Sequence, residues 1–280
     1  MKSALLSLMI LSISYVLASE AKASNSPSQS TEQFCADRSE GSYVKNLSKI
    51  STNLMSFKNH GGIGNGGVCW WHSRFQRSAL YLTVYKPAEP MPNLEEAKKI
   101  IKKIRAANEI VTIPGFQNFY QFSGAYSALI QDELERWQKT DGITKFNWVM
   151  GLSGVSESSP KKLKKKMDEL FQYVVIEGNI AYQKLQIKGV MAHAWLVVDM
   201  KKVDDGYDLE IIDSNFQWST SFYKYRNGQT AFDYHAYGKA NPYLEREKEM
   251  EGIHLTVLKK CNPEEYERKK PVVSNNNNEF

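Results

Sequence analysis

The amino-acid sequence predicts an α+β fold, with a mainly helical lobe over residues 33–175 and a mainly antiparallel sheet lobe over residues 176–265. In the first half, apolar residues recur at intervals of three and four, as on the buried face of a helix. In the second half they alternate with polar residues or form short runs, as in strands. Helices and strands separated in this way along one chain are typical of an α+β domain, which we expect over residues 33–270.

The chain starts with the features of an export signal. A charged start precedes an apolar run from Ala4 to Ala18, which predicts a secretory signal peptide. Small-x-small motifs end at Ala18 and at Ala23, so cleavage fits after either residue, and we take residues 1–23 as the signal peptide. The run is shorter than the roughly 20 apolar residues of a membrane-spanning helix. We therefore expect an exported protein, periplasmic or secreted, with no stable membrane insertion after signal cleavage.

Both ends of the expected domain are flanked by polar sequence. Residues 24–32 lack aromatic and branched apolar side chains and predict a flexible leader, and the Asn-rich residues 271–280 predict a disordered tail. The net charge of +5 is modest and spread among acidic residues, so no nucleic-acid partner is predicted.

The chain has three cysteines, Cys35, Cys69 and Cys261. An odd number in an exported chain leaves at least one thiol unpaired within the monomer. Of the three possible pairings we favour Cys35–Cys261, which ties the two ends of the domain together and leaves Cys69 free. Spacing alone does not fix this connectivity, so the other two pairings stay open.

The helices are predicted from apolar periods and from capping residues. Asn93 precedes two acidic residues and suits an N-cap, and Ser159-Pro160 is a typical helix start. The expected helices span residues 43–57, residues 94–108, residues 126–139, and a segment that opens at Pro160.

The strands are expected over residues 182–187, 193–200, 207–213 and 253–258. Asp205-Gly206 marks the turn of a hairpin between the second and third of these strands. If that hairpin is centred near Val203, His193 lies opposite Asp213 and both side chains point to one face of the sheet. A slip of one residue would separate them.

A glycine-rich stretch over residues 61–67 precedes the free cysteine. Its five glycines exclude a stable helix or strand interior, while Ser73–Leu82 contains neither Gly nor Pro and is compatible with a helix. Cys69 is therefore expected where a close-approach loop turns into a helix N-terminus. The helix dipole and the free N–H groups at such a terminus favour a thiolate, which is the nucleophilic form of cysteine.

Two further residues complete a possible catalytic arrangement. A thiol nucleophile needs an imidazole that takes its proton and later protonates the leaving group. The imidazole in turn needs a hydrogen-bond acceptor that fixes its orientation. His193 and Asp213, brought together by the predicted hairpin, supply these groups. The sequence therefore predicts a Cys69–His193–Asp213 triad, which requires no cofactor.

The order of these motifs resembles that of the papain-like cysteine peptidase superfamily. The matching elements are Cys69-Trp70, His193-Ala194 and Asp213-Ser214-Asn215-Phe216. Papain itself has Asn-Ser-Trp at the third element, and the Asp variant here is closer to the bacterial YopT-like branch. The resemblance covers three short motifs. It implies an N-terminal helical lobe, a C-terminal antiparallel sheet lobe, an active-site cleft between them, and a peptide or protein substrate.

The resemblance also identifies one departure. The family usually has a Gln six residues before the cysteine to hold the oxyanion, and that position here is Ile63. Asn65 carries an amide and is the best substitute, with the backbone N–H of Cys69 as the second donor. Four tryptophans are candidates to line the cleft and bind substrate, although core packing is favoured for any one of them taken singly: Trp70, Trp71, Trp195 and Trp218.

Several alternatives stay open from the sequence. His72 competes for the base role because it lies one helical turn after Cys69, and these two residues form only half of a metal site, so no metal is predicted. The same triad suits a transglutaminase-like acyltransferase or an amidase that acts on cell-wall peptides. A protein of another class, a non-catalytic binding protein on the same scaffold with a buried or disulfide-bonded Cys69, is the remaining alternative.

Overall fold

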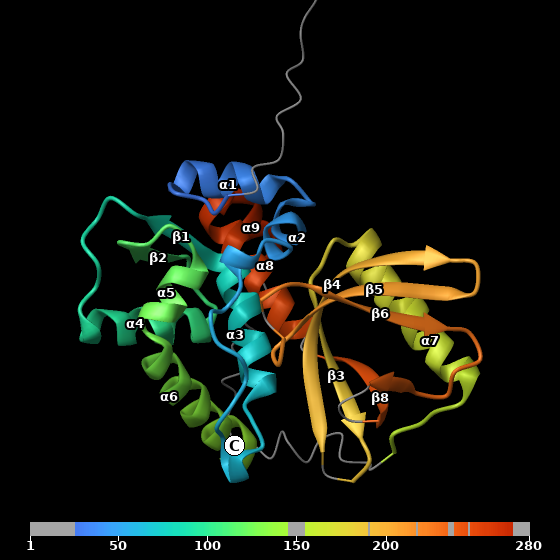
Figure 1. Ribbon diagram of the computed structural model, residues 1–280. Coiled ribbons are helices and arrows are strands. Elements are labelled where there is room, and N and C mark those ends of the chain that lie inside the picture. Colours follow the sequence, from blue (N-terminus) through green and yellow to red (C-terminus); the bar gives the residue numbers. More distant parts are fainter. Residues whose placement is uncertain are drawn as a thin grey trace, which may run out of the picture.

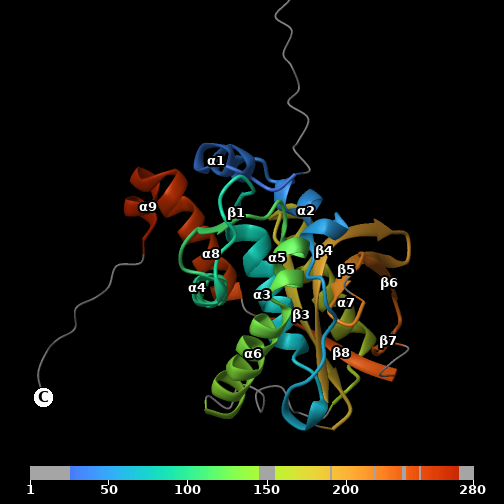
Figure 2. The same cartoon turned by 60° about the vertical axis from the view of Figure 1, so that its left-hand side comes forward.

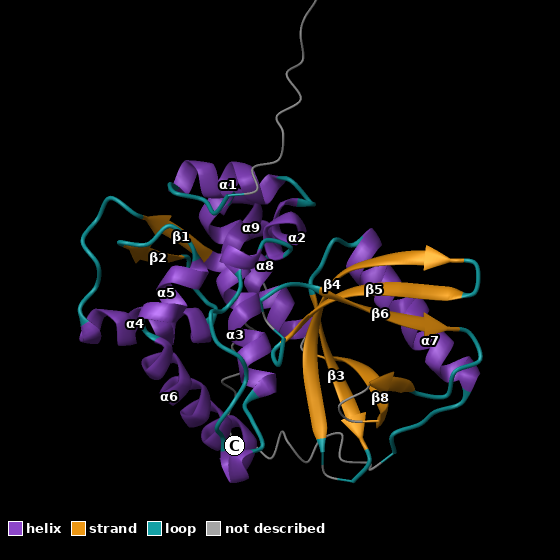
Figure 3. Cartoon of the chain, viewed as in Figure 1, coloured by secondary structure: helices purple, strands orange, loops and turns teal. Residues whose placement is uncertain are grey.

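The computed structural model describes residues 26–144, 155–189, 191–216, 218–234, 238–245 and 247–270. The predicted signal peptide over 1–23 and the predicted tail over 271–280 lie outside these residues. Most helices gather on one side of the molecule and most strands on the other, where α7 also lies (Figure 3). The structure thus confirms a mixed fold of helices and an antiparallel sheet.

The helical side is built from segments of both chain ends (Figure 1). It contains α1 (Thr31–Ser39), α2 (Tyr43–Ser48), α3 (Cys69–Leu82), α4 (Leu94–Ala106), α5 (Phe119–Ala125), α6 (Ser127–Trp137), α8 (Glu247–Cys261) and α9 (Pro263–Lys269). A short parallel pair, β1 (Thr83–Lys86) and β2 (Val111–Pro114), lies beside these helices and is absent from the sequence prediction.

The sheet side contains six strands in the order β6-β5-β4-β3-β8-β7, with every pair antiparallel. The strands are β3 (Ala181–Ile187), β4 (Ala192–Val203), β5 (Gly206–Asp213), β6 (Ser221–Arg226), β7 (Phe232–Tyr234) and β8 (Gly238–Glu245). The sheet is nearly closed into a barrel, because the Tyr223 ring on one edge stacks on Phe232 of the other with ring centroids 4.3 Å apart.

Helix α3 is the element on which both sides pack. All of its residues except Trp70 are buried. Phe75 and Ala79 belong to the core of the helical side. Leu80 and Leu82 belong to a second core, which lies between α3 and one face of the sheet and also contains Leu196. A turned view shows α3 between α6 and the sheet (Figure 2). The apolar surface buried on two sides of this helix fixes the position of its first residue, Cys69.

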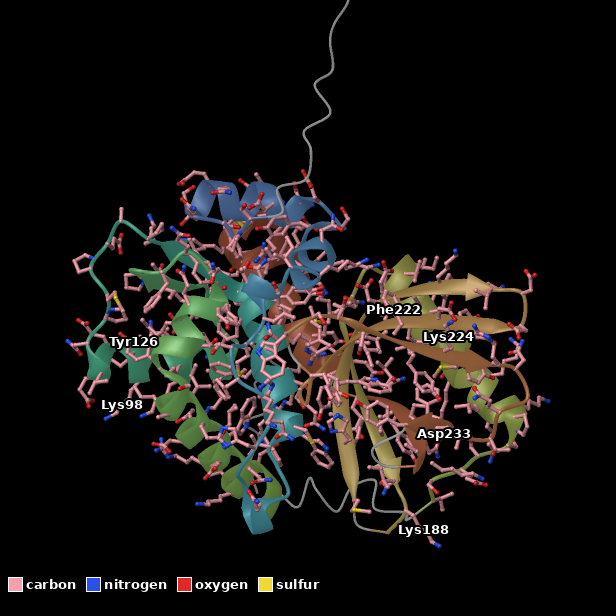
Figure 4. The ribbon with its side chains drawn as sticks, in the orientation of Figure 1. Lys98, Tyr126, Lys188, Phe222, Lys224 and Asp233 are labelled. Atoms are coloured by element: carbon pink, nitrogen blue, oxygen red, sulfur yellow. A yellow bond between two sulfur atoms is a disulfide. The ribbon has the colours of Figure 1, made fainter. Side chains whose placement is uncertain are left out.

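A third core forms on the other face of the sheet. Helix α7 (Pro160–Phe171) presents Leu163, Met167 and Leu170, spaced at three and four, to this face. Phe222 and Lys224 of β6 are exposed on the sheet (Figure 4). The lobe division therefore differs from the predicted one, because α7 packs with the sheet and α8 returns to the helical side.

The capping predictions are confirmed. Asn93 accepts hydrogen bonds from the backbone N–H groups of Glu95 and Glu96 and forms a capping box with Glu96. The side chain of Ser159 accepts from the backbone N–H of Lys162 and caps α7.

Other predicted elements differ in extent or type. The helix expected over 43–57 ends at Ser48 and is followed by a 3₁₀ turn over Ser51–Asn53. In the segment expected as a flexible leader, Ser28 is buried and α1 begins at Thr31.

The strand predicted over 253–258 is wrong, because these residues belong to α8. Their apolar residues alternate with polar ones over a few positions, and this short run imitates a strand. In the helix, Met250 and Ile253 lie one turn apart and enter the core shared with α3, and Val257 packs beside them. The helical period is visible only when the pattern is extended toward the N-terminus.

The hairpin of β4 and β5 has a register that differs from the predicted one. Val203 pairs with Gly206 at the turn, and Trp195 pairs with Asp213 further along. Asp213 therefore lies opposite Trp195, two residues along β4 from its predicted partner His193. An even displacement keeps His193 and Asp213 on the same face as diagonal neighbours.

A β-bulge at Val198 produces this arrangement. The register shifts by one residue between Val197 and Asp199, which leaves Val198 as the extra residue on β4. Without the shift, Asp213 would pair with Leu196 and its side chain would point away from His193. The bulge therefore decides which residues meet at the end of the hairpin.

The predicted Cys35–Cys261 disulfide is present and joins α1 to α8, with a sequence separation of 226 and a Cα–Cα distance of 5.3 Å. It also anchors Arg38, which donates hydrogen bonds to the carbonyl oxygens of Leu80 and Tyr81 at the C-terminal end of α3. The disulfide thus supports the end of α3 that is far from Cys69.

Replacing both Cys35 and Cys261 by serine is expected to lower the free energy of unfolding by about 3–5 kcal/mol, because a long loop in the unfolded chain is released. Urea unfolding of the oxidised parent and the double variant measures this difference. The reactivity of Cys69 is expected to persist in the folded variant, since the 14 residues of α3 place the two ends about 20 Å apart. A change below about 1 kcal/mol would contradict the prediction.

Candidate active site

Cys69 is the first residue of α3, as the sequence predicts, and it is the free cysteine of the described residues. The preceding glycine loop is held in place by side chains of α6 and the turn after it. Glu135 accepts a hydrogen bond from the backbone N–H of Gly62, and Gln138 accepts from Ile63 and donates to the carbonyl oxygen of Gly67. The loop is therefore a fixed support for the start of α3.

His193 lies between Cys69 and Asp213. Its Nε2 is 2.9 Å from Asp213 Oδ1, and both side chains are buried. Because a carboxylate oxygen accepts, Nε2 carries the hydrogen, which leaves Nδ1 for Cys69. Burial opposes a charge on this imidazole, but the charge of Cys69, the hydrogen bonds to Asp213 and Cys69, and the charge of Asp213 raise the pKa of His193 to about 10. The surroundings favour an imidazolium.

Asp213 is positioned by three donors. Oδ1 accepts from His193 and from the backbone N–H of Asn215 at 2.9 Å, and Oδ2 accepts from the hydroxyl of Tyr234. The carboxylate is sealed from solvent at the end of β5. A buried carboxylate with these partners holds the imidazole in one orientation and stabilises its protonated form.

Tyr234 is a member of the site that the sequence analysis missed. Its ring lies nearly parallel to that of His193, with centroids 6.1 Å apart and an interplanar angle of 16°, and it meets Trp195 edge-on. It comes from β7, a three-residue strand with no motif that distinguishes it from other short apolar segments. Only the curvature of the sheet brings it to Asp213.

Ser73 is a second residue that sequence reasoning missed. Its hydroxyl donates to the carbonyl oxygen of Ala194 at 3.2 Å and ties the start of the second turn of α3 to β4, one residue after His193. Across the same junction, the sulfur of Cys69 lies 4.0 Å from the carbonyl oxygen of Ala192. The thiol and the imidazole are thus carried on two elements that are joined on both sides of His193.

The predicted oxyanion donors stand differently in the structure. The backbone N–H of Cys69, at the start of α3, has no acceptor among the described residues. Asn65 lies exposed in a 3₁₀ turn with a left-handed φ of 56°, and its side chain forms no hydrogen bond with the described residues. Its role as the second donor stays a prediction.

His72 is excluded as the base by its contacts. It is buried, and its Nε2 donates to the carbonyl oxygen of Phe57 at 3.0 Å. Burial lowers its pKa to about 4, although the bond to Phe57 and the charge of Asp213 act in the opposite direction. A neutral imidazole committed to a backbone carbonyl has a structural role.

The buried His72 is expected to make the protein sensitive to acid. Because its pKa falls from about 6.5 in the unfolded chain to about 4, the unfolded state binds more protons between these pH values. The contribution of neutral His72 to the free energy of unfolding is fully present above about pH 6.5 and decreases as the pH falls toward 4. At pH 4.5 the loss is expected to be about 2–3 kcal/mol.

Urea unfolding at pH 7 and pH 4.5 measures this contribution. His72→Gln is expected to reduce the loss of stability between the two pH values, and His60→Gln, which alters an exposed imidazole, is expected to leave it unchanged. Equal losses in the parent chain and in His72→Gln would contradict the assignment.

Three of the four tryptophans predicted to bind substrate are covered. Trp195 is fully buried and donates from Nε1 to Gln183, and Trp71 belongs to the helical core, so neither has surface left for a substrate. Trp70 is half-buried, stacked on Trp71 and covered by the Lys184 ammonium 4.0 Å from its ring centroid. Core packing explains these three residues.

The fourth tryptophan remains available. Trp218 is 56% exposed and follows the loop after Asp213, in which Phe216 is 57% exposed. The contact of Trp218 with a substrate stays a prediction.

The described residues show neither a metal-binding cluster nor a membrane-spanning helix. They contain no cluster of three or more His, Cys, Asp or Glu side chains placed to hold a metal ion. Within the same residues, no helix combines the length and the apolar character needed to cross a lipid bilayer.

The geometry defines the class of site: a thiol, an imidazole and a carboxylate in hydrogen-bond order, at the junction of a buried helix and an antiparallel sheet. Comparison of the chain with known protein families, with curated proteins and with solved structures gives no match. The functional conclusion therefore depends on the site itself.

Proposed function

We propose that this protein is an exported cysteine peptidase, a thiol hydrolase of papain-like type that cleaves amide bonds through Cys69, His193 and Asp213. One observation carries the proposal: His193 lies between the buried Asp213 carboxylate, 2.9 Å from Nε2, and the thiol at the N-terminus of α3. Helix N-termini and an adjacent imidazolium are the surroundings that activate a cysteine.

The first half of the proposed reaction transfers the acyl group to the enzyme. The Cys69 thiolate attacks the amide carbonyl carbon and forms a C–S bond, and the developing oxyanion is held by the backbone N–H of Cys69 and, as predicted, by Asn65. His193 then gives its proton to the amide nitrogen, the C–N bond breaks, and an amine leaves. Asp213 keeps the imidazolium oriented during this step.

The second half releases the acyl group. Water attacks the thioester while His193 takes its proton, the C–S bond breaks, and a carboxylic acid leaves with the thiolate–imidazolium pair restored. An amine in place of water would yield a new amide, which is the chemistry of a transglutaminase-like acyltransferase. An amidase that acts on cell-wall peptides would use the same steps.

Export and a papain-like cleft between the lobes are part of the proposal. A disulfide is stable in an oxidising compartment such as the periplasm or the extracellular medium, and the Cys35–Cys261 bridge agrees with that location. A peptide or protein that reaches such a compartment, including cell-wall peptide, is the proposed substrate. The free state of Cys69 weighs against a binding protein in which this thiol is consumed by a disulfide, whereas its burial agrees with the form of that alternative in which the thiol is buried.

The test is the incubation of the purified protein with an unstructured polypeptide and, separately, with solubilised cell-wall peptides in ¹⁸O-labelled water. Mass spectrometry is expected to show new carboxyl termini that carry the label. A parallel reaction with added glycine amide distinguishes transfer, because the product then gains the mass of the amine. Cys69→Ala, prepared in the same way, is the control, and identical products from both proteins would refute a thiol hydrolase.

A further inference from the structure

Asn59 connects the two loops that carry opposite ends of the candidate triad. Its Oδ1 accepts from the backbone N–H of Val68 at 2.5 Å, directly before Cys69. Its Nδ2 donates to Asn215 Oδ1 at 3.0 Å, and its backbone N–H donates to the carbonyl oxygen of Ser214 at 2.7 Å. One residue thus binds the chain next to the nucleophile and the chain next to Asp213.

The last glycine of the glycine loop makes room for this amide. A Cβ at Gly67 would lie 2.4 Å from Nδ2 and 2.8 Å from Oδ1 of Asn59, and the φ of Gly67 is +86°. By contrast, Gly64 has a similar left-handed φ of +61° but no atom within 4 Å of such a Cβ. The need for glycine at Gly67 therefore arises from the close approach of Asn59 as well as from the backbone.

These contacts reach both partners of His193. On one side, the bond to Val68 fixes the entry into α3 and with it the direction of the Cys69 side chain. On the other side, Asn215 donates its backbone N–H to Asp213 Oδ1, the same oxygen that His193 binds. A displacement of Asn59 would therefore alter the thiol–imidazole and the imidazole–carboxylate geometry together.

We propose that Asn59 is a positioning residue that holds the Cys69 loop and the Asp213 loop in register, so that His193 meets both partners at once. This inference rests on the proposed function, because it assigns Asn59 to the activation of Cys69. Asn59 is half-buried and lies ten residues before the cysteine, outside every motif that the sequence analysis identified.

The test compares the rate of iodoacetamide alkylation of Cys69 at pH 5.5 and at pH 9.5 in the folded, oxidised protein. Asn59→Ala is expected to lower the rate at pH 5.5 by about tenfold, because a displaced imidazolium stabilises the thiolate less. At pH 9.5, where a thiol ionises without help, the rate is expected to change by less than about twofold.

Two matched controls separate positioning from a general loss of stability. Asn53→Ala removes a buried amide that donates to the carbonyl oxygen of Leu47, so it is expected to lower the unfolding midpoint without changing the ratio of the two rates. Gly67→Ala is expected to reproduce the effect of Asn59→Ala, whereas Gly64→Ala is not. The glycine pair keeps the test valid if Asn59→Ala fails to fold.

Each outcome decides a stated point. If Cys69 of the parent chain reacts at pH 5.5, and Asn59→Ala and Gly67→Ala show the same ratio of alkylation rates at pH 5.5 and pH 9.5, the role of Asn59 is overturned. The proposed function is then left intact. A parent chain whose Cys69 does not react at pH 5.5 overturns both. A reduced ratio in these two variants, with unchanged ratios in Asn53→Ala and Gly64→Ala, supports the inference.

Discussion

His193→Ala is expected to reduce the alkylation of Cys69 at pH 5.5 by up to about 10³-fold, because an ordinary thiol is only about 0.1% ionised at that pH. In the parent chain the imidazole has a pKa raised to about 10, against its burial, by the charge of Cys69 and by Asp213, so it stays protonated beside the sulfur. Amide hydrolysis is expected to fall by about 10³-fold or more, since the same group also protonates the leaving amine.

The comparison variant for this prediction is His254→Ala. His254 is exposed, its Nε2 lies 2.8 Å from Asn179 Oδ1, and it sits on α8, toward the other end of α3 from Cys69. Loss of an imidazole there is expected to leave alkylation and hydrolysis close to the parent values. Equal reactivity of Cys69 in the parent chain and in His193→Ala would contradict the assignment of His193.

Asp213→Asn is expected to lower kcat by about 10²-fold or more, with the fold retained. The carboxylate accepts from His193, Asn215 and Tyr234, and it supplies the negative charge that stabilises the imidazolium. An amide has one oxygen and one donor group, so it cannot satisfy three donors at once and it removes the charge. The pH profile of hydrolysis is expected to change along with kcat.

Asp208→Asn provides the matched control for this substitution. Asp208 lies on the same strand and pairs with Arg226, 2.8 Å from its Nη2, in a partly exposed position. Such an ion pair contributes about 0–1 kcal/mol, so hydrolysis is expected to remain at the parent level. A loss of activity in Asp208→Asn as large as that in Asp213→Asn would show that the strand, and not the carboxylate beside His193, is responsible.

Local chemistry made part of this structure predictable. The glycines and the uninterrupted segment after Ser73 placed Cys69 at a helix start, and the structure begins α3 at that residue. The caps at Asn93 and Ser159 are predictable because their side chains can accept hydrogen bonds from the free N–H groups at a helix start. The odd cysteine count reduced the disulfide to three pairings, of which the favoured Cys35–Cys261 is the one found.

Features that depend on tertiary contacts were not predictable in this way. The bulge at Val198 changes the face on which Asp213 lies, and no local sequence pattern in β4 predicts this bulge. Tyr234 reaches Asp213 only because the sheet curves until its edges meet. A tryptophan in a sequence suits a substrate cleft as well as a protein core, and the burial of Trp195 and Trp71 in the structure assigns both to the core.

The most direct test of the account is the pH dependence of iodoacetamide alkylation in the oxidised parent protein, with the modified residue mapped by mass spectrometry. We expect one adduct, at Cys69, formed at a rate that stays high at pH 5.5, where ordinary thiols are almost fully protonated. A rate that is negligible at pH 5.5 and rises about tenfold per pH unit toward pH 8.5, as for an isolated thiol, would contradict it.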